Sequence, residues 1–482
     1  MDYNIEINNH IKELLSKYDD TYLYNNETKE YYFNNIDSED SEDSEDSEDS
    51  EDSEDSEDSE NSEDSENSKN SEDSNKSSGR VDKTLGEEFR GEIIREYMLL
   101  DKIGYGAFSS VWLGYSYKKD ELVAIKICHP QDHKDGLKEL NILDKIKEKV
   151  IDLTNILTYI ENFEIKPIIE KEDYYNKDIL NNHIVIVMPL LGCTSYNLLD
   201  LKKYKNGLSL DILKKIMKQL ILGLIELDKV GIMHTDIKPE NILIEGITYK
   251  NKFILEIIKK INIDEIKKYF IKKYKIDDKI ILSQISKTLS EYIKLKDMYD
   301  EDCIMDEYLE DIKIKLCDFN CSLEYENKLG NKDIEIQTRY YRAPEIILGC
   351  GLHKTTDIWS LGCLFYELLT GKILFDPEKD DMSTDQKHLY LITELLGSID
   401  KKIIMNSSNR EELYDSNYRL YNCDKKIKKI DLKDKMKTDI DKKIYSNNQL
   451  KYISKFIESI LCINTNDRLL YKDILILLEK LH

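Results

Sequence analysis

Apolar and polar residues alternate along "YMLLDKIGYGAFSSVWLGYSYKKDELVAIKIC", from Tyr97 to Cys128, and glycines interrupt the alternation. This pattern is typical of antiparallel strands joined by tight turns. A helix is predicted next, because apolar residues recur at near-helical spacing at Leu137, Leu140, Leu143, Ile146 and Val150. From Leu208 onward, long stretches such as "LDILKKIMKQLILGLIELDKV" have a helical period. The sequence therefore predicts an α+β protein in which a small β-rich lobe precedes a larger α-helical lobe.

The pattern places residues 97–192 in the first lobe and residues 193–482 in the second. An insertion rich in Lys and Ile, at about 247–311, interrupts the second lobe. At least its first part should form an amphipathic helix, because four isoleucines fall on one helical face: Ile254, Ile257, Ile258 and Ile261. We interpret the insertion as a helical excursion packed on the body of the protein. The alternative is an element that binds a partner or directs localisation.

The acidic charge is concentrated near the N-terminus. Residues 37–74 repeat the triplet Ser-Glu-Asp and contain ten Asp, eleven Glu and one Lys, which gives a formal charge of −20. The whole chain of 482 residues carries −26, so only −6 remains for the rest. Because residues 37–79 contain no apolar residue to bury, they should be disordered, following a polar segment at 1–36. The repeat would serve as a solubilising spacer, attract basic partners, or be phosphorylated on its serines.

Nine cysteines are scattered along the chain without CxxC pairs, so neither a zinc site nor a disulfide framework is predicted. No N-terminal segment has the pattern of a secretory signal, and no apolar run is long enough to span a bilayer. We therefore expect a soluble, intracellular monomer in the cytoplasm, with entry into the nucleus left open. We expect no membrane partner and no direct nucleic-acid partner.

The stretch "IGYGAFSSV" places Gly104 and Gly106 between two strands. Glycine there would let the backbone approach a phosphate and offer its amide hydrogens. A simple hairpin turn is the alternative reading of the same residues. A dinucleotide-binding fold is disfavoured, because Ser109 occupies the place of a third glycine and a strand, not a helix, follows.

Lys126 lies inside the apolar strand "LVAIKIC". Burying its charge costs desolvation energy unless an anion or a carboxylate meets it. Glu139, on the following helix, is a candidate partner. Alternatively, Lys126 faces solvent at a sheet edge, and Glu139 is an ordinary surface glutamate.

The stretch "GIMHTDIKPENILI" places several polar groups between two apolar runs. Pro239 prevents the preceding residues from continuing as a helix, so we predict a loop between a helix and a strand. In that loop, Asp236 would accept a hydrogen bond from a substrate hydroxyl and Lys238 would steady a phosphate during transfer. Asn241 would bind a metal through its amide oxygen. His234 is predicted to be a buried structural residue.

Motifs in a fixed order cover about Tyr97 to the C-terminus: the glycine loop, "VAIK", Glu139, "HTDIKPEN", "CDF", "RAPE", "DIWSLG" and "NDRLL". Their order and spacing resemble the eukaryotic protein kinase fold. The resemblance implies a bilobal protein with a small antiparallel β-rich N-lobe carrying helix C and a larger α-helical C-lobe. It implies that Lys126 pairs with Glu139 and with the α- and β-phosphates of ATP. It also implies that Asp236 is the catalytic aspartate and that Asn241 and Asp318 bind Mg2+.

ATP and Mg2+ are the cofactors that the resemblance implies. Met188 would be the gatekeeper, and residues 189–192 would form the hinge that meets adenine. The implied ATP-binding residues are Ile103, Gly104, Tyr105, Gly106, Ala107, Phe108, Ser109, Ser110, Val111, Ala124, Lys126, Glu139, Met188, Leu190, Leu191 and Leu243. Lys238 and Thr338 resemble markers of serine/threonine kinases.

The resemblance also implies architectural roles for three other residues. Glu345 and Arg468 would form a buried ion pair, and Asp357 would brace the catalytic loop. "HTDIKPENIL", "EIQTRYYR" and "DQKHLYLITELLG" resemble the SR-protein kinases of the CMGC group, which phosphorylate Arg/Ser-rich proteins. Carboxylates that precede the helix "HLYLITELL", at Asp380, Asp381 and Asp385, would dock a basic substrate; the alternative is a solvated run of charge.

Two departures from the kinase pattern affect the expected mechanism. Thr235 stands where arginine is common, which removes a partner for a phosphate on the activation loop and predicts activity without loop phosphorylation. Asn320 stands where glycine usually follows Asp-Phe, and asparagine tolerates left-handed backbone angles. We predict an active protein serine/threonine kinase. The alternative is a weak or inactive kinase-shaped scaffold that binds basic partners.

Overall fold

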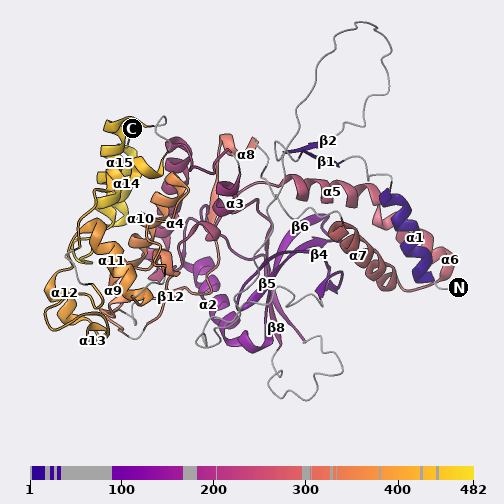
Figure 1. Cartoon of the computed structure of the whole chain (residues 1–482). Helices are drawn as coiled ribbons and strands as arrows, with labels where there is room; N and C mark the ends of the chain where they lie inside the picture. The colour runs from indigo at the N-terminus through magenta and orange to yellow at the C-terminus, as the bar shows by residue number, and fades with distance from the viewer. Residues whose placement is uncertain are drawn as a thin grey trace, which may run out of the picture.

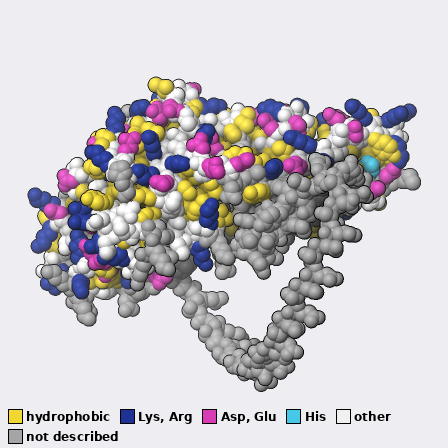
Figure 2. Space-filling view, turned by 90° about the horizontal axis from the view of Figure 1, so that it is seen from above, with side chains coloured by type: hydrophobic (Ala, Val, Ile, Leu, Met, Phe, Trp, Pro, Cys, Tyr) yellow, Lys and Arg dark blue, Asp and Glu magenta, His cyan; other side chains and the backbone are white. Residues whose placement is uncertain are grey.

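The computed structural model describes residues 3–16, 22–25, 30–33, 89–166, 182–201, 203–295, 304, 307–325, 329–332, 334–378, 382–423, 427–440 and 445–481. The acidic repeat, Asp380 and Asp381 lie outside the described residues. Figure 2 shows basic and acidic side chains interspersed on the face of the described residues that it presents. Among the described residues, the structure contains no helix that is long and apolar enough to cross a membrane.

The N-lobe is built on a six-stranded antiparallel sheet with the order β3-β4-β5-β6-β8-β7 (Figure 1). Its strands are β3 (Ile93–Ile94), β4 (Tyr97–Tyr105), β5 (Ser109–Ser116), β6 (Glu121–Cys128), β7 (Glu161–Ile165) and β8 (His183–Pro189). The alternating segment therefore forms the antiparallel strands that the sequence predicts. A separate hairpin pairs β1 (Tyr22–Asn25) with β2 (Glu30–Phe33).

A short 3-10 helix, η2 (Pro130–Asp132), leads into α2 (His133–Lys149), which packs against β8. Leu140, Leu143 and Ile146 are buried, as the periodicity predicts. Leu137 is 39% exposed, so its assignment to the apolar face was wrong. The buried face of α2 instead includes Glu139, which is 3% exposed. A prediction based on apolar residues alone does not place a charged residue on the buried face. Glu139 can be buried there because its carboxylate is paired.

The C-lobe is helical around α10 (Thr356–Thr370), every residue of which is buried. Its other helices are α3 (Ser195–Asp200), α4 (Leu210–Lys229), α9 (Pro344–Ile347), α11 (Thr384–Leu396), α12 (Lys401–Asn406), α13 (Arg410–Leu413), α14 (Leu432–Asp439), α15 (Asn447–Ile460) and α16 (Tyr471–Glu479). Short strand pairs join β9 (Ile232–Met233) to β12 (Leu323–Glu324) and β10 (Ile242–Ile244) to β11 (Ile314–Leu316). The bilobal α+β kinase fold is thereby confirmed.

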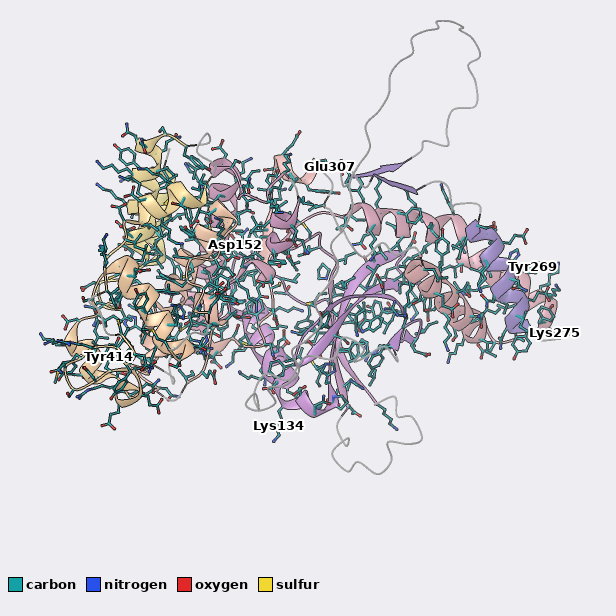
Figure 3. All side chains as sticks on the ribbon, viewed as in Figure 1. Lys134, Asp152, Tyr269, Lys275, Glu307 and Tyr414 are labelled. Carbon is teal, nitrogen blue, oxygen red and sulfur yellow. The ribbon has the colours of Figure 1, made fainter. Side chains whose placement is uncertain are left out.

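The insertion forms α5 (Tyr249–Ile261), α6 (Ile263–Tyr274) and α7 (Asp278–Leu295), followed by α8 (Glu307–Glu310). The amphipathic helix predicted for its first part is confirmed, because its four isoleucines are buried in α5. The insertion packs on the body of the protein as predicted, but on the N-lobe: α7 contacts β4. Figure 1 shows α5, α6 and α7 on the side of the sheet away from the C-lobe helices. Figure 3 shows Tyr269 and Lys275 at the outer tip of this insertion.

The polar N-terminal segment contains a helix that the sequence analysis did not predict. This helix, α1 (Tyr3–Ser16), buries Ile7, Ile11 and Leu15. These side chains share one hydrophobic cluster with α5, α6 and α7 and with Met98 and Leu113 of the N-lobe sheet. An amphipathic helix of this length is marginal by itself, so its stability depends on the tertiary contact.

Candidate active site

Lys126 lies at the centre of the site, on β6. Its Nζ donates to Glu139 Oε1 at 2.7 Å and to Asp318 Oδ1 at 2.9 Å. Lys126 is 8% exposed and Glu139 is 3% exposed. The alternative interpretations, in which Lys126 faces solvent and Glu139 is a surface residue, were therefore wrong. Burial makes both charges costly, and the ion pair offsets that cost. The structure thus brings together three residues that lie far apart in the sequence.

The pKa values in this triad follow from burial and from the opposite charges. Burial alone would lower the pKa of Lys126, but the carboxylates of Asp318 and Glu139 raise it above its usual value. The ammonium of Lys126 lowers the pKa of Asp318 to about 2, against the opposing effect of desolvation. At neutral pH, Lys126 is therefore cationic and Asp318 is an anion whose side chain remains exposed within the site.

Asp236, in the loop after β9, organises a second group of polar side chains. Its Oδ1 accepts from Thr338 Oγ1 at 2.6 Å, and its Oδ2 lies 2.8 Å from Lys238 Nζ. Asn241, in the 3-10 helix η4 (Pro239–Asn241), donates from Nδ2 to Asp236 Oδ2 at 3.0 Å and to the Asp236 carbonyl at 2.8 Å. Because the amide nitrogen of Asn241 is used in this way, its amide oxygen is the atom suited to a cation.

The predicted bracing of the catalytic loop is confirmed. Asp357, buried on α10, accepts from the backbone N–H of His234 at 2.8 Å and of Thr235 at 3.0 Å. The His234 ring is buried, lies edge-to-face against Phe319, and has Nε2 2.9 Å from the Cys317 carbonyl oxygen. These contacts hold the loop against the segment that carries Asp318.

The two departures from the kinase pattern have structural counterparts. Thr235 Oγ1 donates to the Cys321 carbonyl at 2.8 Å, so this side chain links the catalytic loop to the residues after Asp318. The left-handed backbone angle in that segment falls at Asp318, with φ 63°, and not at Asn320. Asn320 therefore does not use the tolerance of asparagine for left-handed angles in this structure. Activity without loop phosphorylation stays a prediction.

The predicted buried ion pair between Arg468 and Glu345 is also confirmed. Arg468 contributes two parallel bonds of 2.8 Å, from Nη1 to Oε1 and from Nη2 to Oε2. Thr356 Oγ1 donates to Glu345 Oε1 at 3.0 Å. Both partners are almost fully buried, so this pair is a bidentate lock between α9 and the loop before α16.

The two groups of polar residues open into one cavity of about 710 Å3, within the usual range for ligand pockets. Every predicted ATP-binding residue except Ser110 lines it, and so do Asp236, Lys238, Asn241 and Asp318. Side chains alternate along a strand, so Ser109 and Val111 face the cavity whereas Ser110 faces away. Ser110 Oγ is buried and accepts from Trp112 Nε1 at 3.1 Å. The Ser110 side chain therefore does not line the cavity, and its contact with ATP stays a prediction.

The glycine loop and the hinge residues that line the cavity are closely packed. Met188 pairs with Ala124 between β8 and β6, and both residues line the cavity. Gly192 donates its N–H to the Ile244 carbonyl at 2.9 Å, and a Cβ on Gly192 would lie 2.9 Å from the same oxygen, so only glycine fits. In the glycine loop, the Gly106 N–H donates to the Ser109 carbonyl at 2.9 Å and closes the hairpin.

Several residues that line the cavity were missed from the sequence. They include Leu157, Thr194, Asn197, Glu240, Asn251, Cys317, Asn320 and Glu335. Cys317 could have been predicted to line the cavity, because it directly precedes Asp318 in the sequence. Asn251 belongs to the insertion, and no local pattern could have placed it in the cavity.

Asp385, one of the three predicted docking carboxylates, forms an ion pair with Arg339. Arg339 lies in the 3-10 helix η5 (Arg339–Tyr341), close in sequence to Thr338. The docking role of Asp385 stays a prediction, because part of its charge is already matched within the chain.

Comparison with known families identifies the class of protein. The protein kinase domain family matches residues 97–259 and 251–476, so the chain belongs to this family. The chain is a serine/threonine protein kinase similar to members of the CMGC group. Protein kinase domains use ATP and Mg2+ and act on protein substrates.

Individual relatives support the same group. The chain is 28% identical over 453 residues to protein kinase dsk1 of Schizosaccharomyces pombe, covering 80% of each chain. It is 30% identical over 343 residues to the serine/threonine-protein kinase SRPK of Physarum polycephalum, covering 68% of this chain and 73% of that one. It is 27% identical over 431 residues to a putative serine/threonine-protein kinase of Acanthamoeba polyphaga mimivirus, covering 68% and 77%.

Proposed function

We propose that the cavity binds Mg–ATP and transfers the γ-phosphoryl group to a serine or threonine hydroxyl through the residues described above. One observation carries this proposal: the triad of Lys126, Glu139 and Asp318 opens into the same cavity as Asp236 and Asn241. Among the described residues of the site, none argues for the inactive scaffold considered as the alternative.

Each residue of the site would have a separate role toward the phosphates or the cation. Lys126, held by Glu139, would bind phosphate oxygens, and Mg2+ would neutralise charge on the phosphates. The ionised carboxylate of Asp318 and the amide oxygen of Asn241 fit this cation, because Mg2+ prefers oxygen ligands and keeps few protein ligands when phosphates supply others. Catalysis in this arrangement depends on positioning and on electrostatic stabilisation.

Asp236 would accept the hydrogen bond of the substrate hydroxyl and orient it toward the phosphorus. Its Oδ1 is bound by the Thr338 hydroxyl, which shows that this oxygen accepts from a hydroxyl at 2.6 Å. Lys238 Nζ lies 3.2 Å from Thr338 Oγ1 and 2.8 Å from Asp236 Oδ2. Its charge would therefore lie beside the transferred group and offset the negative charge that develops there.

We further propose that the substrates are serines in arginine-rich segments. The similarity to a kinase named SRPK supports this substrate class. Glu240 supports it most, because it is an exposed carboxylate that lines the same cavity; Glu335 also lines the cavity and is exposed, but it already lies 3.7 Å from Arg342 Nη2. A guanidinium near the acceptor serine would pair with such carboxylates. Glu240 lies in the catalytic loop, so it is the nearer of the two in sequence to Asp236.

A positional peptide library tests the substrate proposal. Wild-type protein with Mg–ATP should phosphorylate serine peptides with arginine near the acceptor several-fold better than peptides with alanine there. Glu240→Gln should reduce that preference, since one charge-assisted contact is lost. Glu411→Gln, at an exposed position on α13 that does not line the cavity, is the matched control and should change nothing. A wild-type enzyme indifferent to arginine would overturn the substrate proposal.

A further inference from the structure

The insertion reaches the nucleotide cavity at the beginning of α5. Lys250 Nζ bonds to Asp101 Oδ2 at 2.8 Å, and both side chains are buried. Asp101 belongs to β4, the strand that continues to Ile103 and Gly104 at the cavity. Thr248, which precedes α5, bridges to Ile304 at the end of the insertion. The first turn of α5 is therefore joined by an ion pair to β4, an N-lobe strand that lines the cavity.

Asn251, next to Lys250, lines the cavity and is 3% exposed. The Thr248 hydroxyl caps α5 by accepting from the Asn251 backbone N–H at 3.1 Å. This places Asn251 at the third position of the helix, where a polar side chain commonly returns to the capping residue. In the part of the chain that the structure describes, Asn251 Oδ1 instead has no hydrogen-bond partner.

Helix α3 provides an internal comparison. It also begins after a threonine, Thr194, and has an asparagine, Asn197, at the third position. There the capping box is complete, because Asn197 Oδ1 accepts from the Thr194 backbone N–H at 3.2 Å. The same residue types in the same positions thus satisfy the asparagine oxygen in α3 and leave it unsatisfied in α5. A buried acceptor without a donor costs free energy, which favours a donor supplied from the cavity.

A nucleotide has suitable donors in its ribose hydroxyls. The apolar residues Met188 and Leu243 line the cavity where adenine would lie, while Lys126 marks the phosphate end. The sugar must lie between these two ends. We propose that Asn251 Oδ1 accepts a hydrogen bond from a ribose hydroxyl of the bound nucleotide, so that the insertion forms part of the nucleotide site. This inference rests on the proposed binding of ATP in the cavity.

Affinities for ATP, 2′-deoxy-ATP and 3′-deoxy-ATP, measured by calorimetry with full-length protein, test the inference. Wild-type protein should bind ATP about 3- to 10-fold more tightly than at least one deoxy analogue, the range expected for one hydrogen bond. Asn251→Leu should lose this discrimination because its affinity for ATP falls to that for the analogue. Without nucleotide, Asn251→Leu should melt no lower than wild type, because an unsatisfied buried oxygen is removed.

Ser286→Ala is the matched control. Ser286 is on α7 of the same insertion, is fully buried, does not line the cavity, and has an Oγ without a partner among the described residues. Its replacement should leave all three affinities unchanged. If Asn251→Leu keeps the wild-type ratio of ATP to deoxy-ATP affinity, the inference is overturned. If nucleotides bind with the expected ratio but no phosphoryl group is transferred, the proposed function fails and the role of Asn251 stands.

Discussion

Asp236→Ala should lower kcat for phosphorylation of an arginine/serine peptide by about 10²- to 10⁴-fold, the range for loss of a general acid–base group. The carboxylate of Asp236 is the acceptor that would orient the substrate hydroxyl, and it also positions Lys238 and Asn241. Affinity for ATP should fall much less, because Lys126 and Asp318 retain their ion pair. Transfer of a radiolabelled γ-phosphoryl group measures the first effect, and calorimetric titration with ATP measures the second.

Asp311→Ala is a suitable control for this experiment. Asp311 has an 87% exposed side chain and a loose contact of 3.9 Å to Lys313, outside the cavity. Its replacement should leave kcat unchanged. Equal labelling by wild type and by Asp236→Ala would contradict the proposed mechanism.

Arg468→Ala should lower the free energy of unfolding by about 3–5 kcal/mol, because it leaves the buried carboxylate of Glu345 without its partner. The side chains of Arg468 and Glu345 are 0% and 4% exposed, so water cannot compensate for the lost contact. Denaturant unfolding monitored by circular dichroism measures the effect. Activity should fall in parallel at temperatures near the lowered transition.

Two further variants show whether the effect comes from an uncompensated charge. The double variant Glu345→Leu/Arg468→Met should recover a large part of the loss, since it removes both charges while keeping apolar volume. Lys218→Ala removes an exposed ion pair with Glu479, whose side chains are 53% and 58% exposed, and should cost less than about 1 kcal/mol. An Arg468→Ala protein as stable as Lys218→Ala would contradict the assigned role of the buried pair.

The sequence predicted those parts of the fold and the site that depend on local patterns and ordered motifs. The strands from Tyr97 to Cys128, the amphipathic α5 and the bracing by Asp357 all follow from such patterns. The pairing of Lys126 was foreseen because a lysine within an apolar strand requires a negative partner. The predicted positions of strands, helices and loops were therefore sufficient to identify the residues that carry the proposed chemistry.

The remaining features depend on contacts that no local pattern encodes. Helix α1 is stabilised by packing on an insertion more than two hundred residues away in the sequence. The buried Lys250–Asp101 pair joins that insertion to the N-lobe, beside the apolar contact of α7 with β4, and in the sequence these two residues look like ordinary surface charges. The motif names a run of residues that includes Ser110, but the Ser110 side chain does not line the cavity, because strand geometry directs alternate side chains to opposite faces.

The central claim is that Lys126, Asp318 and Asn241 together hold the phosphates and the divalent cation of ATP. A crystal structure of the protein with Mn2+ and a non-hydrolysable ATP analogue tests it most directly, because Mn2+ is identified by its anomalous scattering. We predict an anomalous peak bonded to Asp318 and to Asn241 Oδ1, with a phosphate oxygen beside Lys126 Nζ. A nucleotide bound outside the cavity, or a cation that touches neither Asp318 nor Asn241, would contradict the account.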